Sequence, residues 1–188
     1  MKKIIFVTSN KGKIVSAQEY FKNIKLIPYD ADLIEPRTDD IKEIAKQKVL
    51  QAYGIVKEPC IALDSGFFIK ELNGFPKAYV NHALETIGIE GILKLMEEKQ
   101  DKSCEFRSCV AYYDGEKLEF FESQSLGKIS DRIRGKHTDK KWSDLWYIFM
   151  PNHFDKTLAE FNEEDFKLHQ NLKEDSAIKK FAIWYKKN

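Results

Sequence analysis

The sequence lacks the features of a membrane protein and of a disulfide-bonded protein. Its three cysteines, Cys60, Cys104 and Cys109, are odd in number and fall outside any Cys-x-x-Cys spacing. We therefore expect reduced thiols in a cytoplasmic protein, without structural zinc. The apolar residues 4–7 follow two lysines, but the run stops at Thr8, too early for a signal peptide. No apolar run is long enough to span a bilayer, so no membrane association is expected.

An excess of charge of one sign is also absent. The 31 Lys and Arg residues nearly balance the 30 Asp and Glu residues, which leaves a formal net charge of +1. A protein so balanced has no global field that attracts nucleic acid, so any electropositive site must be local. A chain of 188 residues with 43% hydrophobic content can bury one good core. Because we find no repeat, low-complexity run or linker, we expect a single domain over residues 1–188.

The stretch from Thr8 to Lys13 separates an apolar run from a segment whose apolar residues recur at helical spacing. We expect a buried strand over residues 4–7 and a helix that starts after the turn. A helix N-terminus offers unpaired N–H groups and a positive dipole end, to which Thr8 and Asn10 add hydrogen bonds and Lys13 a charge. This pattern favours a phosphate site, although Asn10 is equally suited to an ordinary helix cap.

A second helical pattern follows an acidic loop over residues 30–40, with Gly54 standing past its expected end. Lys48 falls within the apolar stripe of this helix, whereas Glu43 points to the opposite face. A lysine on an inward face needs either an anion to pair with or a path for its ammonium group back to water, and the pattern leaves both open. The stripe consists of Ile41, Ile44, Ala45, Val49 and Ala52.

The apolar residues 60–63 predict a central strand that ends at Asp64-Ser65-Gly66. Ligands of open α/β sheets gather beyond the carboxyl ends of strands, so an acid at this place is a candidate for a functional site. The alternative is a simple turn, in which an aspartate precedes a glycine for conformational reasons alone.

The second half of the chain changes character. From position 103 the apolar period approaches two, and an Asp-Gly turn signal at positions 114–115 predicts an antiparallel pair of strands within an α/β protein. Residues 128–141 are rich in Lys, Arg and His, and Trp142 and Trp146 follow. This mixture suits stacking on a base and holding phosphates. A solvated loop followed by core residues explains the same pattern.

Taken together, these stretches resemble the inosine/xanthosine triphosphate pyrophosphatase family, whose members split non-standard purine nucleoside triphosphates into monophosphate and pyrophosphate. The order and spacing of the motifs agree over most of the chain, strongly up to about Met96 and weakly after Gly135. The motifs are the stretch from Thr8 to Lys13, Asp32-Leu33-Ile34-Glu35, Gln47-Lys48, Asp64-Ser65-Gly66, Leu72-Asn73-Gly74-Phe75-Pro76 with Tyr79, Glu90-Gly91-Ile92 and Thr157-Leu158-Ala159-Glu160.

The resemblance implies a role for each matching residue. Glu35 and Asp64 would bind Mg²⁺, Asp64 would also accept the proton of the attacking water, and Lys13 would assist catalysis. These roles are physically reasonable, because a triphosphate needs lysines and a hard, oxygen-liganded cation to offset its charge. Thr8, Asn10 and Lys13 would hold the triphosphate, and Lys48 would reach it from its helix. The further residues expected to bind the substrate are Ser9, Ser65 and Gly66.

Three departures from the family pattern affect the site. Leu63 stands where the family usually has an acid immediately before the catalytic aspartate. The Phe-Gly-Tyr/Trp-Asp motif is missing from residues 142–147, and the Ser-His-Arg motif is missing from residues 166–171. The phosphate half of the site therefore survives while the half that reads the base does not. The remaining candidates for contacts with the base are Trp142, Trp146, Lys167 and His169.

The resemblance implies an α/β fold with a long mixed twisted sheet flanked by helices, two lobes around a central cleft, and a homodimer. The expected activity is magnesium-dependent hydrolysis of a nucleoside triphosphate, such as ITP or XTP, to monophosphate and pyrophosphate. Two other functions remain open at this point. Leu63 favours a regulatory protein that binds nucleotides without turnover, and the basic, aromatic region 128–146 favours a nucleic-acid-binding module.

Overall fold

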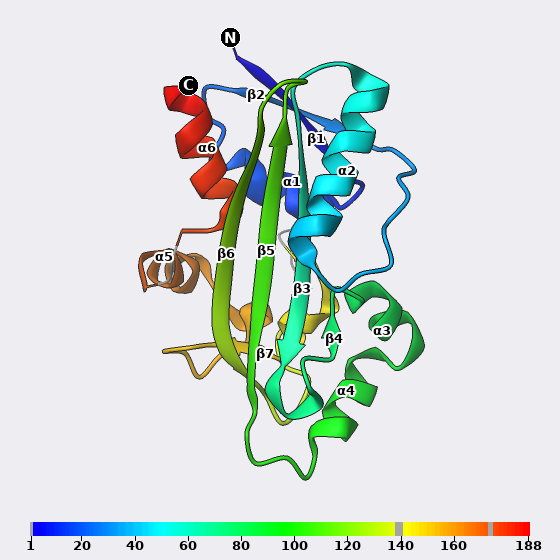
Figure 1. Ribbon diagram of the computed structural model, residues 1–188. Coiled ribbons are helices and arrows are strands. Elements are labelled where there is room, and N and C mark those ends of the chain that lie inside the picture. Colours follow the sequence, from blue (N-terminus) through cyan, green and yellow to red (C-terminus); the bar gives the residue numbers. More distant parts are fainter. Residues whose placement is uncertain (1, 138–140, 173–174) are drawn as a thin grey trace. The chain divides into compact units, whose positions relative to one another are not determined.

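The strands of the described chain form one mixed sheet. The structure, a computed structural model, describes residues 2–137, 141–172 and 175–188. Its 7-stranded sheet has the order β2-β1-β3-β5-β6-β7, with β4 paired to β3 (Figure 1). Six α-helices accompany the sheet in these residues, so the expected mixed sheet flanked by helices is confirmed.

The strands and helices have the following bounds: β1 Lys3–Val7, α1 Lys11–Gln18, β2 Lys25–Tyr29, α2 Ile41–Val56, β3 Cys60–Ile69, β4 Pro76–Lys77, α3 Val80–Thr86, α4 Gly88–Met96, β5 Ser103–Tyr113, β6 Leu118–Ile129, β7 Phe149–Pro151, α5 Glu163–Leu172 and α6 Ala177–Lys187. Short 3-10 helices span Lys70–Leu72, Asp144–Tyr147 and Leu158–Glu160. The antiparallel pattern expected from position 103 corresponds to β5 and β6, and the Asp-Gly turn signal lies between them. None of the described helices has the length and apolar character needed to cross a membrane.

The chain divides into two compact units. The first comprises Met1–Ser65, Ser108–Ser123 and Asp175–Asn188, and the second comprises Gly66–Arg107 and Gln124–Glu174. Strands β3, β5 and β6 contribute residues to both units. The single domain and the central cleft expected from the sequence stay predictions.

Strand β1 lies between two parallel neighbours in the first unit. Ile5 pairs with Ile27 of β2 on one side and with Cys60 of β3 on the other. The apolar run of β1 is buried from Ile4 to Val7, as is usual for a strand inside a parallel sheet. The expected strand is confirmed, and its carboxyl end delivers the chain to the turn at Thr8.

Helix α2 packs its apolar stripe against the sheet, beside β1 (Figure 1). Asp40 caps its N-terminus, since the side chain accepts hydrogen bonds from the N–H groups of Lys42 and Glu43. The expected end before Gly54 is wrong, because the helix continues to Val56 and Lys57 takes the left-handed cap conformation with φ 54°. The five residues of the predicted stripe are all buried.

Strand β3 corrects a second expectation. It runs without a break from Cys60 to Ile69, so Asp64-Ser65-Gly66 forms no turn. The Ser65 hydroxyl lies 2.9 Å from the hydroxyl of Ser108 on β5, the neighbouring strand. Strand pairing thus overrides the local turn preference of the Asp-Ser-Gly sequence. Asp64 is consequently a mid-strand residue with a buried position, 7% exposed.

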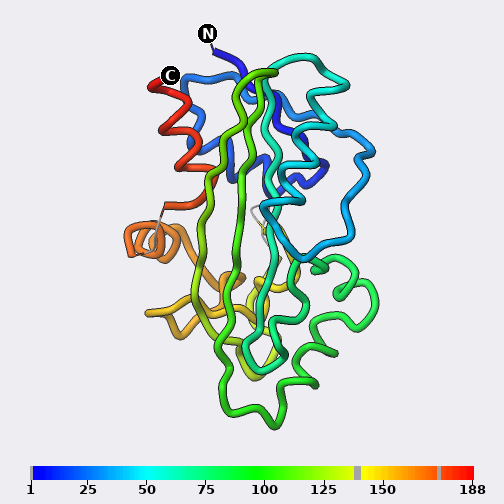
Figure 2. The backbone as a smooth tube through the Cα atoms, viewed as in Figure 1, coloured from blue at the N-terminus to red at the C-terminus, as the bar shows by residue number. Residues whose placement is uncertain are grey.

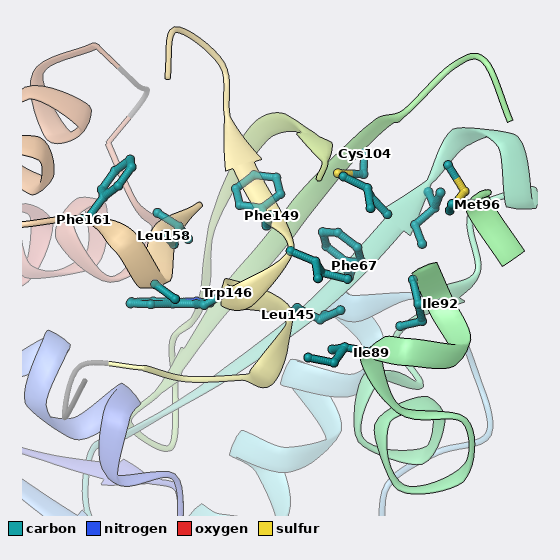
Figure 3. Close-up of a cluster of buried hydrophobic side chains, with 14 residues drawn as sticks. Phe67, Ile89, Ile92, Met96, Cys104, Leu145, Trp146, Phe149, Leu158 and Phe161 are labelled. Carbon is teal, nitrogen blue, oxygen red and sulfur yellow. The ribbon is translucent and has the colours of Figure 1, made fainter. Parts of the chain in front are cut away.

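The second unit has an aromatic core. Phe67, Phe149 and Trp146 lie in one buried cluster with aliphatic residues of α4 (Figure 3). The rings of Phe67 and Phe149 meet edge to face at 5.9 Å, an arrangement favoured by their quadrupoles. Trp146 is only 9% exposed.

A polar cluster fixes a connection of the second unit. The Glu160 carboxylate accepts from the Thr157 N–H at 2.8 Å and pairs with Arg134 at 3.0 Å. The Thr157 hydroxyl in turn lies 3.2 Å from the carbonyl oxygen of Arg134. Gly135, with φ +90°, lies so close to Ala159 that a Cβ atom would meet its carbonyl carbon at 2.4 Å. The Thr-Leu-Ala-Glu motif therefore forms a capping box with a structural role.

Candidate active site

The turn after β1 forms the start of helix α1, as the sequence predicts. The Asn10 side chain accepts the N–H of Lys13 at 3.0 Å, and the Thr8 hydroxyl accepts the N–H of Asn10 at 3.1 Å. Ser9 is exposed, and Gly12 is buried within the first turn of the helix. The positive end of the α1 dipole is therefore surrounded by small polar side chains, an arrangement suited to an anion.

The Lys13 side chain turns from α1 towards β3. Its ammonium group donates to the carbonyl oxygen of Leu63 at 3.1 Å. Burial lowers the pKa of Lys13, and the positive charge of Lys48 acts in the same direction, while Asp64 and Glu35 oppose both. An anionic partner would favour the charged form of this group and oppose the effect of burial.

Lys48 brings two carboxylates together. Its ammonium group contacts Glu35 and, at 2.6 Å, Asp64. Burial acts to lower the pKa of Lys48, but the attraction of Asp64 and the hydrogen bonds to Asp64 and Glu35 outweigh it, so the pKa is raised. The inward orientation predicted for Lys48 is confirmed, and the anions it needs are Glu35 and Asp64.

The carboxylates of Glu35 and Asp64 suit a divalent cation. Both reach the same ammonium group, so one cation between them can contact both. Among residues 2–137, 141–172 and 175–188 no group of three His, Cys, Asp or Glu side chains is placed to hold a metal. A Mg²⁺ ion on this pair would therefore take its other ligands from phosphate oxygens and water, which is its usual preference.

Gln51 and Ser108 belong to this region although sequence reasoning missed them. Gln51 lies on α2 one turn beyond Lys48 and makes two hydrogen bonds to the main chain of Ile34. Helical spacing places Gln51 on the same face as Lys48, so the sequence pattern could have pointed to it. The contact of Ser108 with Ser65 depends on the pairing of two strands, and nothing local to the sequence indicates it.

The predicted site residues divide between the two units. The first unit contains Thr8, Ser9, Asn10, Lys13, Glu35, Lys48, Asp64 and Ser65, and the contacts above join Lys13, Glu35, Lys48 and Asp64 around β3. The second unit contains Gly66, Trp142, Trp146, Lys167 and His169.

The candidates in the second unit have unlike surroundings. Trp146 lies in the core with its ring 6.0 Å from that of Phe166, and Trp142 is half-buried beside the same cluster. Lys167 is exposed on α5. His169 is buried, with the rings of two phenylalanines 5.7 Å from its own. Trp146 and His169 thus have the surroundings of core residues, and base contacts by any of the four stay predictions.

The fold defines an α/β protein. In its first unit, the ammonium groups of Lys13 and Lys48 and the carboxylates of Glu35 and Asp64 lie around β3, and Lys13 belongs to the first turn of α1. This combination suits a phosphorylated ligand held by positive charge and a metal ion. The chain belongs to the Ham1 family, whose family model matches residues 4–184. The resemblance stated from the sequence motifs is confirmed.

Curated relatives match over almost the whole chain. A dITP/XTP pyrophosphatase of Thermococcus kodakarensis is 34% identical and covers 99% of this chain and 98% of its own length. A dITP/XTP pyrophosphatase of Methanopyrus kandleri is 35% identical and covers 99% of this chain and 97% of its own length.

Solved structures share the fold. The Ham1 protein of Staphylococcus aureus superposes with a TM-score of 0.80 at 23% identity, covering 99% of both chains. A HAM1 protein of Coxiella burnetii gives a TM-score of 0.83 at 21% identity, covering 100% of both chains. At sequence identities this low, the structural similarity is evidence of a shared fold only.

Proposed function

We propose that this protein hydrolyses non-standard purine nucleoside triphosphates, such as dITP and XTP, to the monophosphate and pyrophosphate. The observation that carries the proposal is the convergence of Glu35 and Asp64 on the Lys48 ammonium group, with Lys13 beside them. The relatives named as dITP/XTP pyrophosphatases support the reaction class. The enzyme is a nucleoside triphosphate pyrophosphohydrolase.

The charges of the site suit a polyphosphate that binds together with a divalent cation. The two ammonium groups and the two carboxylates sum to zero, so the site has little charge of its own to offer. A divalent cation between the carboxylates makes the sum positive, and a bound triphosphate offsets it. Because Lys48 and Asp64 are largely buried, their interactions are stronger than they would be in water, whereas Glu35 is 63% exposed and its interactions are more screened. Metal and triphosphate are therefore expected to bind together.

Each residue has a role that follows from its contacts. The N-terminus of α1, with Thr8, Ser9 and Asn10, binds phosphate oxygens, and Lys13 neutralises charge that develops on the leaving pyrophosphate. Lys48 exchanges part of its pairing with the carboxylates for a phosphate oxygen. Ser65 and Gly66, which follow Asp64 on β3, are proposed to line the same place.

Asp64 is the proposed general base. Its carboxylate is buried, receives the N–H of Ser65 at 2.9 Å and lies 2.6 Å from the Lys48 ammonium group. These two contacts fix its orientation, so that an oxygen can accept the proton of a water in line with the α-phosphorus.

Mg²⁺ is the proposed cofactor, with Glu35 and Asp64 as its protein ligands. When bound, it neutralises charge on the phosphates and orients the scissile phosphoryl group. Leu63 contributes no carboxylate to this site, but its carbonyl oxygen holds Lys13 in place. The missing acid is thus expected to weaken the metal site without removing the lysine that faces the substrate.

Pyrophosphate release tests the proposal. Purified protein is incubated with dITP, XTP, ITP and the four standard nucleoside triphosphates, with Mg²⁺ or with EDTA. The expected result is pyrophosphate and monophosphate from the non-standard purines, with loss of activity in EDTA. Binding of the same nucleotides without product would instead identify a regulatory protein, and orthophosphate as the product would exclude a pyrophosphohydrolase.

The location and assembly of the protein are proposals of the same kind. Three free, buried cysteines support a reducing, cytoplasmic setting. A homodimer is proposed from the family resemblance, and the half-exposed Tyr79, Ile87 and Leu95 of the second unit are candidates for its contacts.

A further inference from the structure

Gln51 holds the part of the chain that carries Glu35. Its side-chain oxygen accepts the N–H of Ile34 at 3.0 Å, and its amide nitrogen donates to the carbonyl oxygen of Ile34 at 2.8 Å. One side chain thus binds both main-chain polar groups of the residue that precedes Glu35. Lys48, which contacts Glu35 itself, lies one turn earlier on the same helix.

Glu35 lies on a connection that needs such a support. Residues 30–40 have no helix or strand and leave the sheet as a long connection between β2 and α2 (Figure 2). Ile34 is 80% exposed, so burial of this residue does not anchor the segment. The side chain of Glu35 is itself 63% exposed. A carboxylate on an unsupported connection samples many positions, and ordering it costs conformational entropy.

We infer that Gln51 is a positioning residue for the metal site. This inference rests on the proposed function, in which Glu35 and Asp64 bind Mg²⁺. Gln51 contacts neither the proposed metal nor the nucleotide. Its two hydrogen bonds hold the Ile34 main chain so that the Glu35 carboxylate stays beside Asp64. The segment is therefore already ordered before the metal binds, and metal binding loses less conformational entropy.

Gln47 provides a matched control. It lies one turn before Gln51 on α2 and is also half-buried, but its amide donates to Glu43 of the same helix at 2.8 Å. Substitution of either glutamine by methionine keeps the length of the side chain and the helix propensity while it removes both hydrogen-bonding groups. Only Gln51→Met releases the connection that carries Glu35.

The Mg²⁺ dependence of pyrophosphate release tests the inference. We expect Gln51→Met to raise the half-saturating Mg²⁺ concentration by about 5-fold, as two partly exposed hydrogen bonds suggest. The kcat at saturating Mg²⁺ should stay within about 2-fold, because the general base and the lysines are untouched. Gln47→Met should change neither value. Equal Mg²⁺ requirements in the two variants, or a lowered unfolding midpoint of Gln51→Met with an unchanged requirement, would overturn the inference.

A second measurement separates this inference from the proposed function. Binding of Mn²⁺ to the protein together with a dITP analogue that carries an imido group between the α- and β-phosphorus atoms, followed by water-proton relaxation, requires no turnover. Weaker Mn²⁺ binding by Gln51→Met than by Gln47→Met, together with faster hydrogen exchange of the Ile34 amide, supports the positioning role even if the wild-type protein releases no pyrophosphate. Equal Mn²⁺ binding by both variants contradicts it even if the wild-type protein is fully active.

Discussion

In the second unit, Glu160 accepts the N–H of Thr157 and pairs with Arg134, so its charge is used to fix the main chain. In the first unit, the ammonium group of Lys48 pairs with two carboxylates, and Lys13 has one carbonyl oxygen as its partner. In the first cluster Lys48 and Asp64 are largely buried, while the Glu35 side chain is 63% exposed. The first unit joins four charges from separate parts of the chain, and those that are buried lose hydration, which stability alone does not require.

The comparison shows how a structural polar cluster differs from one that serves a ligand. A capping box satisfies orphan main-chain groups, and its removal affects folding. A cluster of ammonium and carboxylate groups leaves strong charges that a metal and an anion can recruit, and its removal affects binding and catalysis. Each of the following substitutions changes one unit, and the two units should respond in different observables.

The largest expected effect is that of Asp64→Asn. Loss of the general base and of a metal ligand should lower kcat for pyrophosphate release by roughly 10³- to 10⁴-fold. The amide keeps the size of the side chain, so the unfolding midpoint should change little. The matched control is Asp101→Asn in the second unit, where Asp101 pairs with Lys70 at 2.8 Å. A near-normal rate for Asp64→Asn would contradict the role of this residue.

Trp146→Ala tests the core of the second unit. Removal of this buried ring should lower the free energy of unfolding by about 3 to 5 kcal/mol, because a cavity remains among Leu145, Phe149 and their neighbours. Chemical denaturation measures the change. If stability stays within about 1 kcal/mol of the wild type while the KM for dITP rises, Trp146 binds the base and its assignment to the core is wrong.

Glu160→Ala should cost about 1 to 2 kcal/mol of stability, since it removes the capping box and the partner of Arg134. Burial acts to raise the pKa of Glu160, but the hydrogen bonds from Thr157 and the charge of Arg134 outweigh it, so the pKa is lowered. The carboxylate therefore stabilises the fold above its ordinary pKa, and this contribution is lost as the pH falls through its folded pKa. Urea titrations should show the difference between wild type and variant narrowing in acid. A constant difference would contradict the ionic role of Glu160.

Lys13→Met should produce the smallest change. Activity should fall, whereas stability should hold or rise. Loss of the charge should lower kcat/KM for the triphosphate by about 10-fold, as expected for one charged hydrogen bond. Stability should hold or rise by about 1 kcal/mol, because a buried ammonium group with a lowered pKa is replaced by an apolar chain of similar length. Steady-state kinetics and thermal unfolding measure the two effects. A clear loss of stability would place Lys13 with the structural residues.

Much of the fold and part of the site follow from the sequence because the signals are local. The stripe of α2, the cap at Asn10 and the strand pair after position 103 depend on neighbours a few residues apart. The inward position of Lys48 followed from the same periodicity.

The features that the sequence did not predict depend on contacts between distant residues. Asp64-Ser65-Gly66 has the composition of a turn, but pairing with neighbouring strands keeps it extended. Glycine is typical of helix ends, but α2 continues past Gly54, and Lys57 is the residue that takes the left-handed conformation at its end. The hydrogen bonds between Gln51 and Ile34 join residues 17 positions apart, and helical periodicity cannot indicate them. It indicates only that Gln51 lies on the same face of α2 as Lys48.

The central claim is that the charged groups of the first unit bind a triphosphate together with Mg²⁺. A crystal structure of the wild-type protein with Mg²⁺ and a dITP analogue carrying an imido group between the α- and β-phosphorus atoms tests it most directly. We predict a metal ion on Glu35 and Asp64, phosphate oxygens at the N-terminus of α1, and Lys13 and Lys48 in contact with the triphosphate. A nucleotide bound elsewhere, with Lys48 still joining the two carboxylates, would contradict the claim.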